Sequence, residues 1–270
     1  MFTPKEVAQN YLKACETKAA LPFGRMLVLS VLAGMFIALA GLAATTASAS
    51  ATGSFARLIS GCVFPAGLAM VMVVGSELFT GNSLMIMGLL QGNITLGGLV
   101  RNYVVVWLGN LLGSILVAAI AAFGHSFAAF GGDLAQAVVN TAAAKTSLSF
   151  GDAFLRGVGC NFLVCIAVWM ANASKTAEGK ILGVFFPIAA FVIAGFEHCV
   201  ANMYYIPAGL FASAIHGIPA PGLTWGAFFL KNLLPVTLGN LVGGAILVGL
   251  PGWYLYLLPE RAGKRTQCHQ

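Results

Sequence analysis

Two segments of this sequence carry the same polar residues at the same spacing, each inside a long apolar run. A Gly-x-Glu-x4-Asn pattern contains Glu77 and Asn82 in the first segment, and Glu197 and Asn202 in the second, where His198 follows the glutamate. A carboxylate in the middle of a membrane costs at least about 2.5–3.5 kcal/mol on insertion scales, so such residues are usually functional or paired. Three roles suit them: catalysis, lining a path for a solute, or bracing the chain.

The bracing role is favoured for Glu77 and Glu197 if the solute is an anion, because a bare carboxylate would repel it. Each carboxylate would accept hydrogen bonds from backbone N–H groups of its own segment. His198 either faces the solute, which we favour, or is a structural partner of its segment. An intramembrane enzyme is disfavoured, since no nucleophile–base pair or metal-ligand cluster accompanies these residues. The six cysteines lack CxxC spacing and lie mostly in apolar runs, so we expect no disulfide, metal site or cofactor.

The composition requires a membrane protein. Hydrophobic residues make up 59% of the 270 residues, charged residues 8%, and the mean hydropathy is +0.90. A water-exposed surface needs about a quarter charged residues, so most of this surface must face lipid. The net charge of +6 is scattered and forms no basic stripe, which excludes a nucleic-acid partner.

The hydrophobic runs predict six transmembrane helices, since a helix needs about 20 apolar residues to cross the bilayer. Two runs are too long for one straight crossing, and each is interrupted by one of the polar segments above. We therefore expect an all-α membrane protein whose second and fifth spans are broken. The predicted spans are 26–46, 58–90, 103–123, 154–173, 181–214 and 225–250.

The basic residues predict the orientation. Ten of the 14 Lys and Arg side chains fall on the side that carries both termini, and four fall on the other side. The positive-inside rule then places both termini in the cytoplasm. We divide the chain into an amphipathic cytoplasmic helix (1–25), a six-span channel domain (26–258) and a cytoplasmic tail (259–270). Thr3-Pro-Lys-Glu6 has the form of a capping box, and the helix after it either lies on the inner membrane face or is an ordinary surface helix.

The two halves of the channel domain form an inverted repeat. Besides the Gly-x-Glu-x4-Asn pattern, Arg101-Asn102 precedes a Leu-Gly-Asn-Leu segment at the same distance as Lys231-Asn232 does. Each unit contains three spans, an odd number, so the second unit must be inserted upside down relative to the first. Irregular backbone at mid-membrane is tolerated only inside protein or beside a water-filled path. With Asn82 and Asn202 as N-caps, the two re-entering helices would direct their N-termini toward an anionic or polar solute.

Several motifs resemble those of the formate/nitrite transporter family, and the resemblance covers essentially the whole chain. It implies an aquaporin-like fold, a homopentamer with one pore per protomer, and passage of small monovalent anions: formate, nitrite or hydrosulfide. It also implies a bacterial or archaeal cytoplasmic (inner) membrane. The motifs are Gly75-Ser-Glu-Leu-Phe-Thr-Gly-Asn82, Lys145-Thr-Ser-Leu-Ser-Phe150, Cys160-Asn161-x3-Cys165-x3-Trp169, Phe196-Glu-His-Cys-Val-Ala-Asn-Met203 and the two Leu-Gly-Asn-Leu segments.

The resemblance also implies roles for individual residues. Thr80 would be the pore-side threonine of a mobile loop, His198 the central histidine, and Lys145 and Asn161 would lie toward the periplasmic vestibule. Formate is the favoured substrate, and nitrite or hydrosulfide is the alternative. The resemblance leaves open whether protons move with the anion. A channel for a neutral solute is disfavoured by Lys145 and His198. The apolar constrictions would be Leu68, Leu78 and Phe191.

Overall fold

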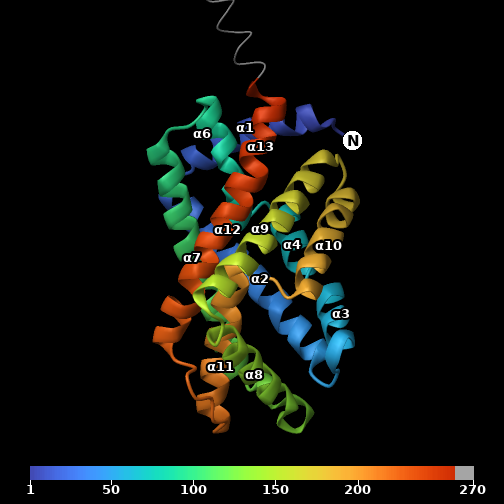
Figure 1. Cartoon of the computed structure of the whole chain (residues 1–270), viewed down its shortest axis with the longest axis vertical. Coiled ribbons are helices and arrows are strands. Elements are labelled where there is room, and N and C mark those ends of the chain that lie inside the picture. The colour runs from blue at the N-terminus through green and yellow to red at the C-terminus, as the bar shows by residue number, and fades with distance from the viewer. Residues whose placement is uncertain (259–270) are drawn as a thin grey trace, which may run out of the picture.

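The computed structural model describes residues 1–258, and the predicted tail, 259–270, lies outside the described residues. Within residues 1–258 every regular element is a helix, and six helices are long and apolar enough to cross a membrane, as predicted. The N-terminus and the end of the last described helix lie at the same end of the molecule (Figure 1). The spans are α2 (Phe23–Ser48), α3 with α4 (Gly53–Val63 and Ala66–Val74), α7 (Leu96–Phe123), α9 (Phe150–Ala173), α10 (Ala177–Ala194), and a last span made of η3 (Ala227–Leu233), α12 (Leu234–Leu241), η4 (Val242–Gly249) and α13 (Leu250–Tyr256).

Both predicted breaks are present, and a glycine ends the helix before each. Gly75 ends α4 with φ +79°, and Gly195 ends α10 with φ +73°, a left-handed conformation that glycine adopts without strain. Three non-helical residues follow each glycine, and the chain then becomes helical again. After the first break come α5 (Phe79–Asn82), η1 (Ser83–Met85) and α6 (Ile86–Gln91), and after the second comes α11 (Cys199–His216).

We expect Gly75→Ala to lower the free energy of unfolding by about 1–2 kcal/mol, the cost of a left-handed conformation for an L-residue. No atom lies within 4 Å of the added methyl group, so the cost comes from the backbone alone. Thermal unfolding in detergent measures it. Gly24→Ala, also in open space but without a positive φ, is the control and should not destabilise. Equal unfolding temperatures for the two variants would contradict the prediction.

A short helix precedes the first span of each half. The helix α1 (Pro4–Ala20) begins with the predicted capping box, and its apolar stripe, including Val7, Tyr11 and Cys15, is buried against the rest of the protein. Burial raises the pKa of the Cys15 thiol to about 12, so this thiol stays protonated. In the other half, α8 (Asp133–Thr146) follows the 3-10 segment η2 (Ser126–Gly132). Figure 1 shows α1 and α8 at opposite ends of the molecule.

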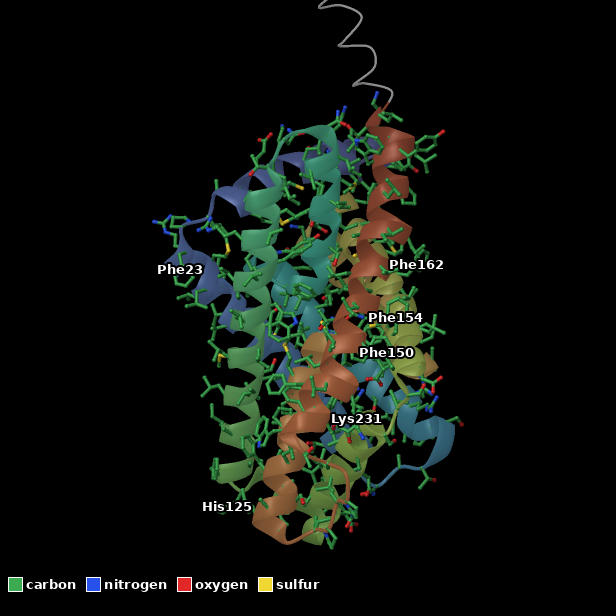
Figure 2. All side chains as sticks on the ribbon, turned by 60° about the vertical axis from the view of Figure 1, so that its left-hand side comes forward. Phe23, His125, Phe150, Phe154, Phe162 and Lys231 are labelled. Carbon is green, nitrogen blue, oxygen red and sulfur yellow. The ribbon has the colours of Figure 1, made fainter. Side chains whose placement is uncertain are left out.

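Glycines let the spans within each half pack backbone against backbone. A Cβ added at Gly113 of α7 would lie 2.0 Å from the Val31 carbonyl oxygen of α2. One added at Gly239 of α12 would lie 2.1 Å from the Phe154 carbonyl oxygen of α9. Small residues at such contacts are typical of membrane helices. The outer surface is apolar, with exposed side chains such as Phe150 projecting from the spans (Figure 2).

Candidate permeation pathway

One cavity opens at the end of the molecule that carries α1. This Lys18 vestibule, of about 360 Å³, is lined by residues of α1, α4, the first break and α9. The ammonium of Lys18 lies 2.7 Å from Glu77 Oε1, and the side-chain amide of Asn82 donates to Glu77 Oε2 at 2.7 Å. The same amide donates to Asn102 Oδ1. Glu77 is only 4% exposed, so the ion pair compensates a nearly buried carboxylate.

A second cavity opens at the opposite end. This Lys145 vestibule, of about 460 Å³, is lined by residues of α2, α3, α8, α9, α10, the second break and α11. Lys145 Nζ lies 2.9 Å and 3.1 Å from the two oxygens of Glu197, to which Asn202 also donates at 2.6 Å. Asn202 donates further to Asn232 Oδ1. The second vestibule therefore repeats the residue pairs of the first, as an inverted repeat requires.

The breaks are held by two asparagines of the Leu-Gly-Asn-Leu segments. Asn110 accepts from the Phe79 N–H at 2.9 Å and donates to the Glu77 carbonyl oxygen at 2.9 Å. Asn240 accepts from the Cys199 N–H at 2.9 Å and donates to the Glu197 carbonyl oxygen at 3.0 Å. Each break thus has its backbone groups satisfied by a neighbouring span. In the sequence these segments indicated only the repeat, and the hydrogen bonds of the two asparagines to the breaks were not predicted.

Two expectations about the breaks are wrong. Glu77 and Glu197 were expected to accept from backbone N–H groups, but their partners are lysine and asparagine side chains. Asn82 and Asn202 were expected to be N-caps. Asn82 ends α5 and Asn202 lies inside the first turn of α11, so the N-cap positions belong to Leu78 and His198. Both asparagines lie four residues after the N-cap positions, and their side-chain amides donate to the carboxylates.

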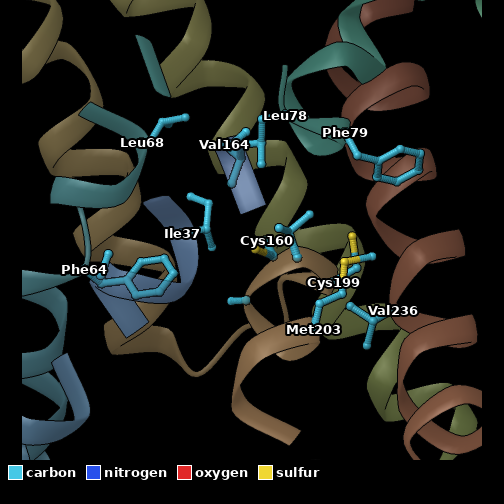
Figure 3. Close-up of a cluster of buried hydrophobic side chains, with 14 of the residues drawn as sticks. Ile37, Phe64, Leu68, Leu78, Phe79, Cys160, Val164, Cys199, Met203 and Val236 are labelled. Carbon is cyan, nitrogen blue, oxygen red and sulfur yellow. The ribbon is translucent and has the colours of Figure 1, made fainter. Parts of the chain in front are cut away.

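An apolar barrier separates the two vestibules, which share no lining residue. Leu68 and Leu78 line the Lys18 vestibule, and both are at most 3% exposed. Figure 3 shows Leu68 on α4 directed toward Leu78 of the first break, with Phe64 farther along the same side. Phe64 lines the Lys145 vestibule. Phe191 lies at the Lys145 vestibule, 3% exposed, and contacts Phe64 edge to face at 5.8 Å. The residues assigned to the constrictions by resemblance therefore lie where the cavities end.

His198 lines the Lys145 vestibule and forms a polar contact with Thr80, which lines neither cavity. His198 Nε2 lies 2.9 Å from Thr80 Oγ1, while Nδ1 accepts from the Ala201 N–H at 3.0 Å. Because Nδ1 is an acceptor here, the neutral ring carries its proton on Nε2 and donates to Thr80. The ring also stacks on Phe191 at 5.9 Å. If Thr80 turns away, the Nε2–H group becomes free to donate to an anion.

Lys145 lines a vestibule, as the resemblance implies, whereas Asn161 is placed differently from expectation. Lys145 lies in the last turn of α8, and its side chain is 15% exposed. Asn161 was expected toward the periplasmic vestibule, but it is fully buried and lines neither cavity. Its amide donates to the Thr80 carbonyl oxygen at 3.2 Å and to the Asn240 carbonyl oxygen at 2.6 Å. Asn161 therefore holds the backbone of Thr80 in place without lining a cavity.

Lys18 is the site residue that the sequence did not single out. It pairs with Glu77 across 59 positions of sequence, and its carbonyl oxygen accepts from Asn102 as the Lys145 carbonyl oxygen accepts from Asn232. The available signal was the repeat itself. Once Glu77 is matched with Glu197, Lys18 before the first span of the first half corresponds to Lys145 before the first span of the second half.

The comparisons with known proteins agree with this architecture. The model of the formate/nitrite transporter family matches residues 5–254. A probable formate transporter of Methanothermobacter thermautotrophicus is 43% identical, over 94% of this chain and 97% of that protein. The formate channel FocA of Haemophilus influenzae is 40% identical, over 83% and 84%. A solved pentameric formate channel with formate bound superposes with a TM-score of 0.77 at 34% identity, over 87% of this chain and 98% of that one. Six spans, two matched breaks and these likenesses together place the chain in the formate/nitrite transporter family, to which it belongs.

Proposed function

We propose that this protein is a channel or transporter for small monovalent anions, with formate as its substrate. The observation that carries the proposal is a lysine–glutamate pair in each vestibule, on either side of an apolar barrier that has His198 at its edge. The names of the relatives, a formate transporter and formate channels, support formate over nitrite and hydrosulfide. The pentameric neighbour supports a homopentamer, and the two vestibules within one chain support a pore in each protomer.

The orientation and the membrane are part of the same proposal. The ten basic residues on the side of the termini support an orientation in which the Lys18 vestibule faces the cytoplasm and the Lys145 vestibule faces outward. Relatives from bacteria and an archaeon support the cytoplasmic membrane as the location. Lipid covers the apolar surface that the neighbouring protomers leave free.

The barrier sets the chemistry of passage. An anion that enters it must shed water, and an unpaired charge there is costly. His198 lowers this cost by donating a hydrogen bond from Nε2 once Thr80 has turned away. As imidazolium it would also pass a proton to formate, and neutral formic acid crosses an apolar ring cheaply. That step requires a proton on Nδ1, which ends the bond from the Ala201 N–H, so proton transfer is tied to movement of the second break.

Flux into proteoliposomes, with formate, nitrite and hydrosulfide in parallel, tests the proposal. Formate is expected to pass fastest. A neutral solute such as glycerol, tested in competition, separates anion passage from the neutral-solute alternative. Glycerol flux without formate flux would overturn the proposal.

We expect Lys145→Ala to reduce formate flux at low salt by several-fold, because the ammonium attracts anions to the Lys145 vestibule. The difference should shrink at 1 M salt, where the Debye length is about 3 Å. Flux of the variant and the wild type at both salt concentrations is the measurement. Lys231→Ala removes an exposed lysine that lines neither vestibule and serves as the control. Unchanged flux at low salt would leave Lys145 as a brace for Glu197 alone.

A further inference from the structure

The two vestibules differ in charge, although their hydrogen bonds match. The charged residues that line the Lys18 vestibule are Lys18 and Glu77, which compensate each other. The Lys145 vestibule has the equivalent pair and, in addition, Arg57 and Arg156. Its lining therefore holds an excess of two positive charges. The inverted repeat does not account for this excess, since neither arginine has a charged counterpart in the lining of the other cavity.

The two arginines approach the second break from different elements. Arg57 lies in the first turns of α3, and its Nη1 contacts the Ile193 carbonyl oxygen at 3.5 Å. Its guanidinium also borders Gly195, where an added Cβ would lie 3.3 Å from Nη1. Arg156 belongs to α9, and its carbonyl oxygen accepts from the Glu197 N–H at 3.2 Å. Both side chains are exposed at the mouth of the cavity.

Neither guanidinium lies in an ion pair with a carboxylate of residues 1–258. A guanidinium presents a planar fork of donors that matches a carboxylate with two parallel hydrogen bonds. Among residues 1–258, the Arg57 guanidinium contacts one carbonyl oxygen and the Arg156 guanidinium makes no hydrogen bond, so most of these donors remain available. Two available forks on one cavity suit a ligand with two carboxylates.

We propose that the Lys145 vestibule binds a small dianion, a short dicarboxylate, between Arg57 and Arg156. The cavity volume of about 460 Å³ lies in the range of small-molecule sites. A monoanion satisfies one fork and leaves the other unused, so the site prefers two charges to one. Lys145 is committed to Glu197 and adds to the field without supplying the binding fork.

A bound dianion does not pass the barrier. One proton from His198 or from water leaves it with a full negative charge, and an unpaired charge among Phe191, Leu68 and Leu78 is costly. The dianion therefore occupies the vestibule and blocks a permeating monoanion. The block acts from this end alone, because the Lys18 vestibule lacks the excess charge. This blocking effect rests on the proposed function, whereas binding does not.

Binding is measured first, by calorimetry on the purified full-length protein in detergent, with oxalate and malonate as probes and acetate as the monoanion comparator. We expect both dicarboxylates to bind more tightly than acetate. Arg57→Gln and Arg156→Gln should each weaken dicarboxylate binding about tenfold, equivalent to about 1.4 kcal/mol. Arg57→Lys keeps the charge but not the fork and should give an intermediate loss. Lys231→Gln removes an exposed charge outside the cavity and should change nothing.

Sidedness is measured next, with malonate added to one face of proteoliposomes in which the protein has a uniform orientation. Formate flux should fall only when malonate is on the face of the Lys145 vestibule, and Arg57→Gln should relieve the block. Equal binding of acetate and dicarboxylates, unchanged binding in both arginine variants, or equal block from both faces would overturn the proposal. If formate does not pass at all, the proposed function fails, and calorimetry still decides the binding site.

Discussion

Replacing His198 with leucine is expected to reduce formate flux about 100-fold. Leucine already occupies the equivalent position of the first break, Leu78, so the variant makes the barrier apolar from both sides. A hydrogen bond to a charged group contributes about 1.5–3 kcal/mol, and each 1.4 kcal/mol is a factor of ten. Leu78 is the N-cap residue of α5 and provides no side-chain cap, so the fold tolerates leucine at that position of the first break. Stopped-flow formate uptake is the measurement, with pentamer elution as a check of folding.

The matched control is His198→Asn, which keeps an acceptor for the Ala201 N–H and a donor toward Thr80. It should retain a substantial part of the formate flux but lose proton coupling. Wild-type flux should rise as pH falls, because a higher proton concentration increases the population of the imidazolium that passes its proton to formate. Internal pH during formate uptake reports the proton movement. Equal proton movement in the wild type and in His198→Asn would make His198 a structural partner of the break only.

The second large effect is expected for Glu197→Ala, on stability. Removing the carboxylate leaves the Lys145 ammonium without its partner and takes an acceptor from Asn202. Breaking a buried ion pair from one side costs about 3–5 kcal/mol, which for a chain of this size lowers the unfolding temperature by roughly 10 °C. Unfolding of the pentamer in detergent is the measurement. Glu77→Ala should behave alike, since Lys18 and Asn82 stand in the same positions.

A double variant separates stability from transport. Glu197→Leu combined with Lys145→Met replaces the ion pair by hydrophobic side chains of similar size, which is often neutral for stability. We expect the unfolding temperature of the double variant to lie much closer to that of the wild type than to that of Glu197→Ala, while its formate flux stays low. If Glu197→Ala is as stable as the wild type but selects different ions, the carboxylate acts on the permeating anion rather than as a brace.

Hydropathy and the repeat predicted most of the architecture. The six spans and both breaks follow from the length of the apolar runs and from the polar residues inside them, which are local properties. The partners of Glu77 and Glu197 are not local. Lys18 lies on a helix whose pattern is that of any amphipathic surface helix, and only the packing of α1 against the first break brings its ammonium to Glu77.

The N-cap prediction failed because of the length of the breaks. Asn82 and Asn202 have a side chain typical of an N-cap, but the irregular segment is only three residues long, so both residues fall beyond the helix start. Asn161 carries no mark in the sequence that distinguishes a pore-lining amide from one buried behind the pore. Its position depends on how α9 packs against Thr80, which is a property of the whole bundle.

The side chains that hold each break come from one half of the chain, and this determines the order in which the two halves can assemble during synthesis. Every side chain that holds the first break, from Lys18 to Asn110, lies within the first 110 residues, and those that hold the second lie between Lys145 and Asn240. At about 5–20 residues per second the ribosome needs roughly 6–20 seconds to make one half. The first half can therefore complete its polar network in the membrane before the second half exists. The contacts of Thr80 with Asn161 and His198 form only when the second half docks, so the candidate pathway is the last part of the protomer to be assembled.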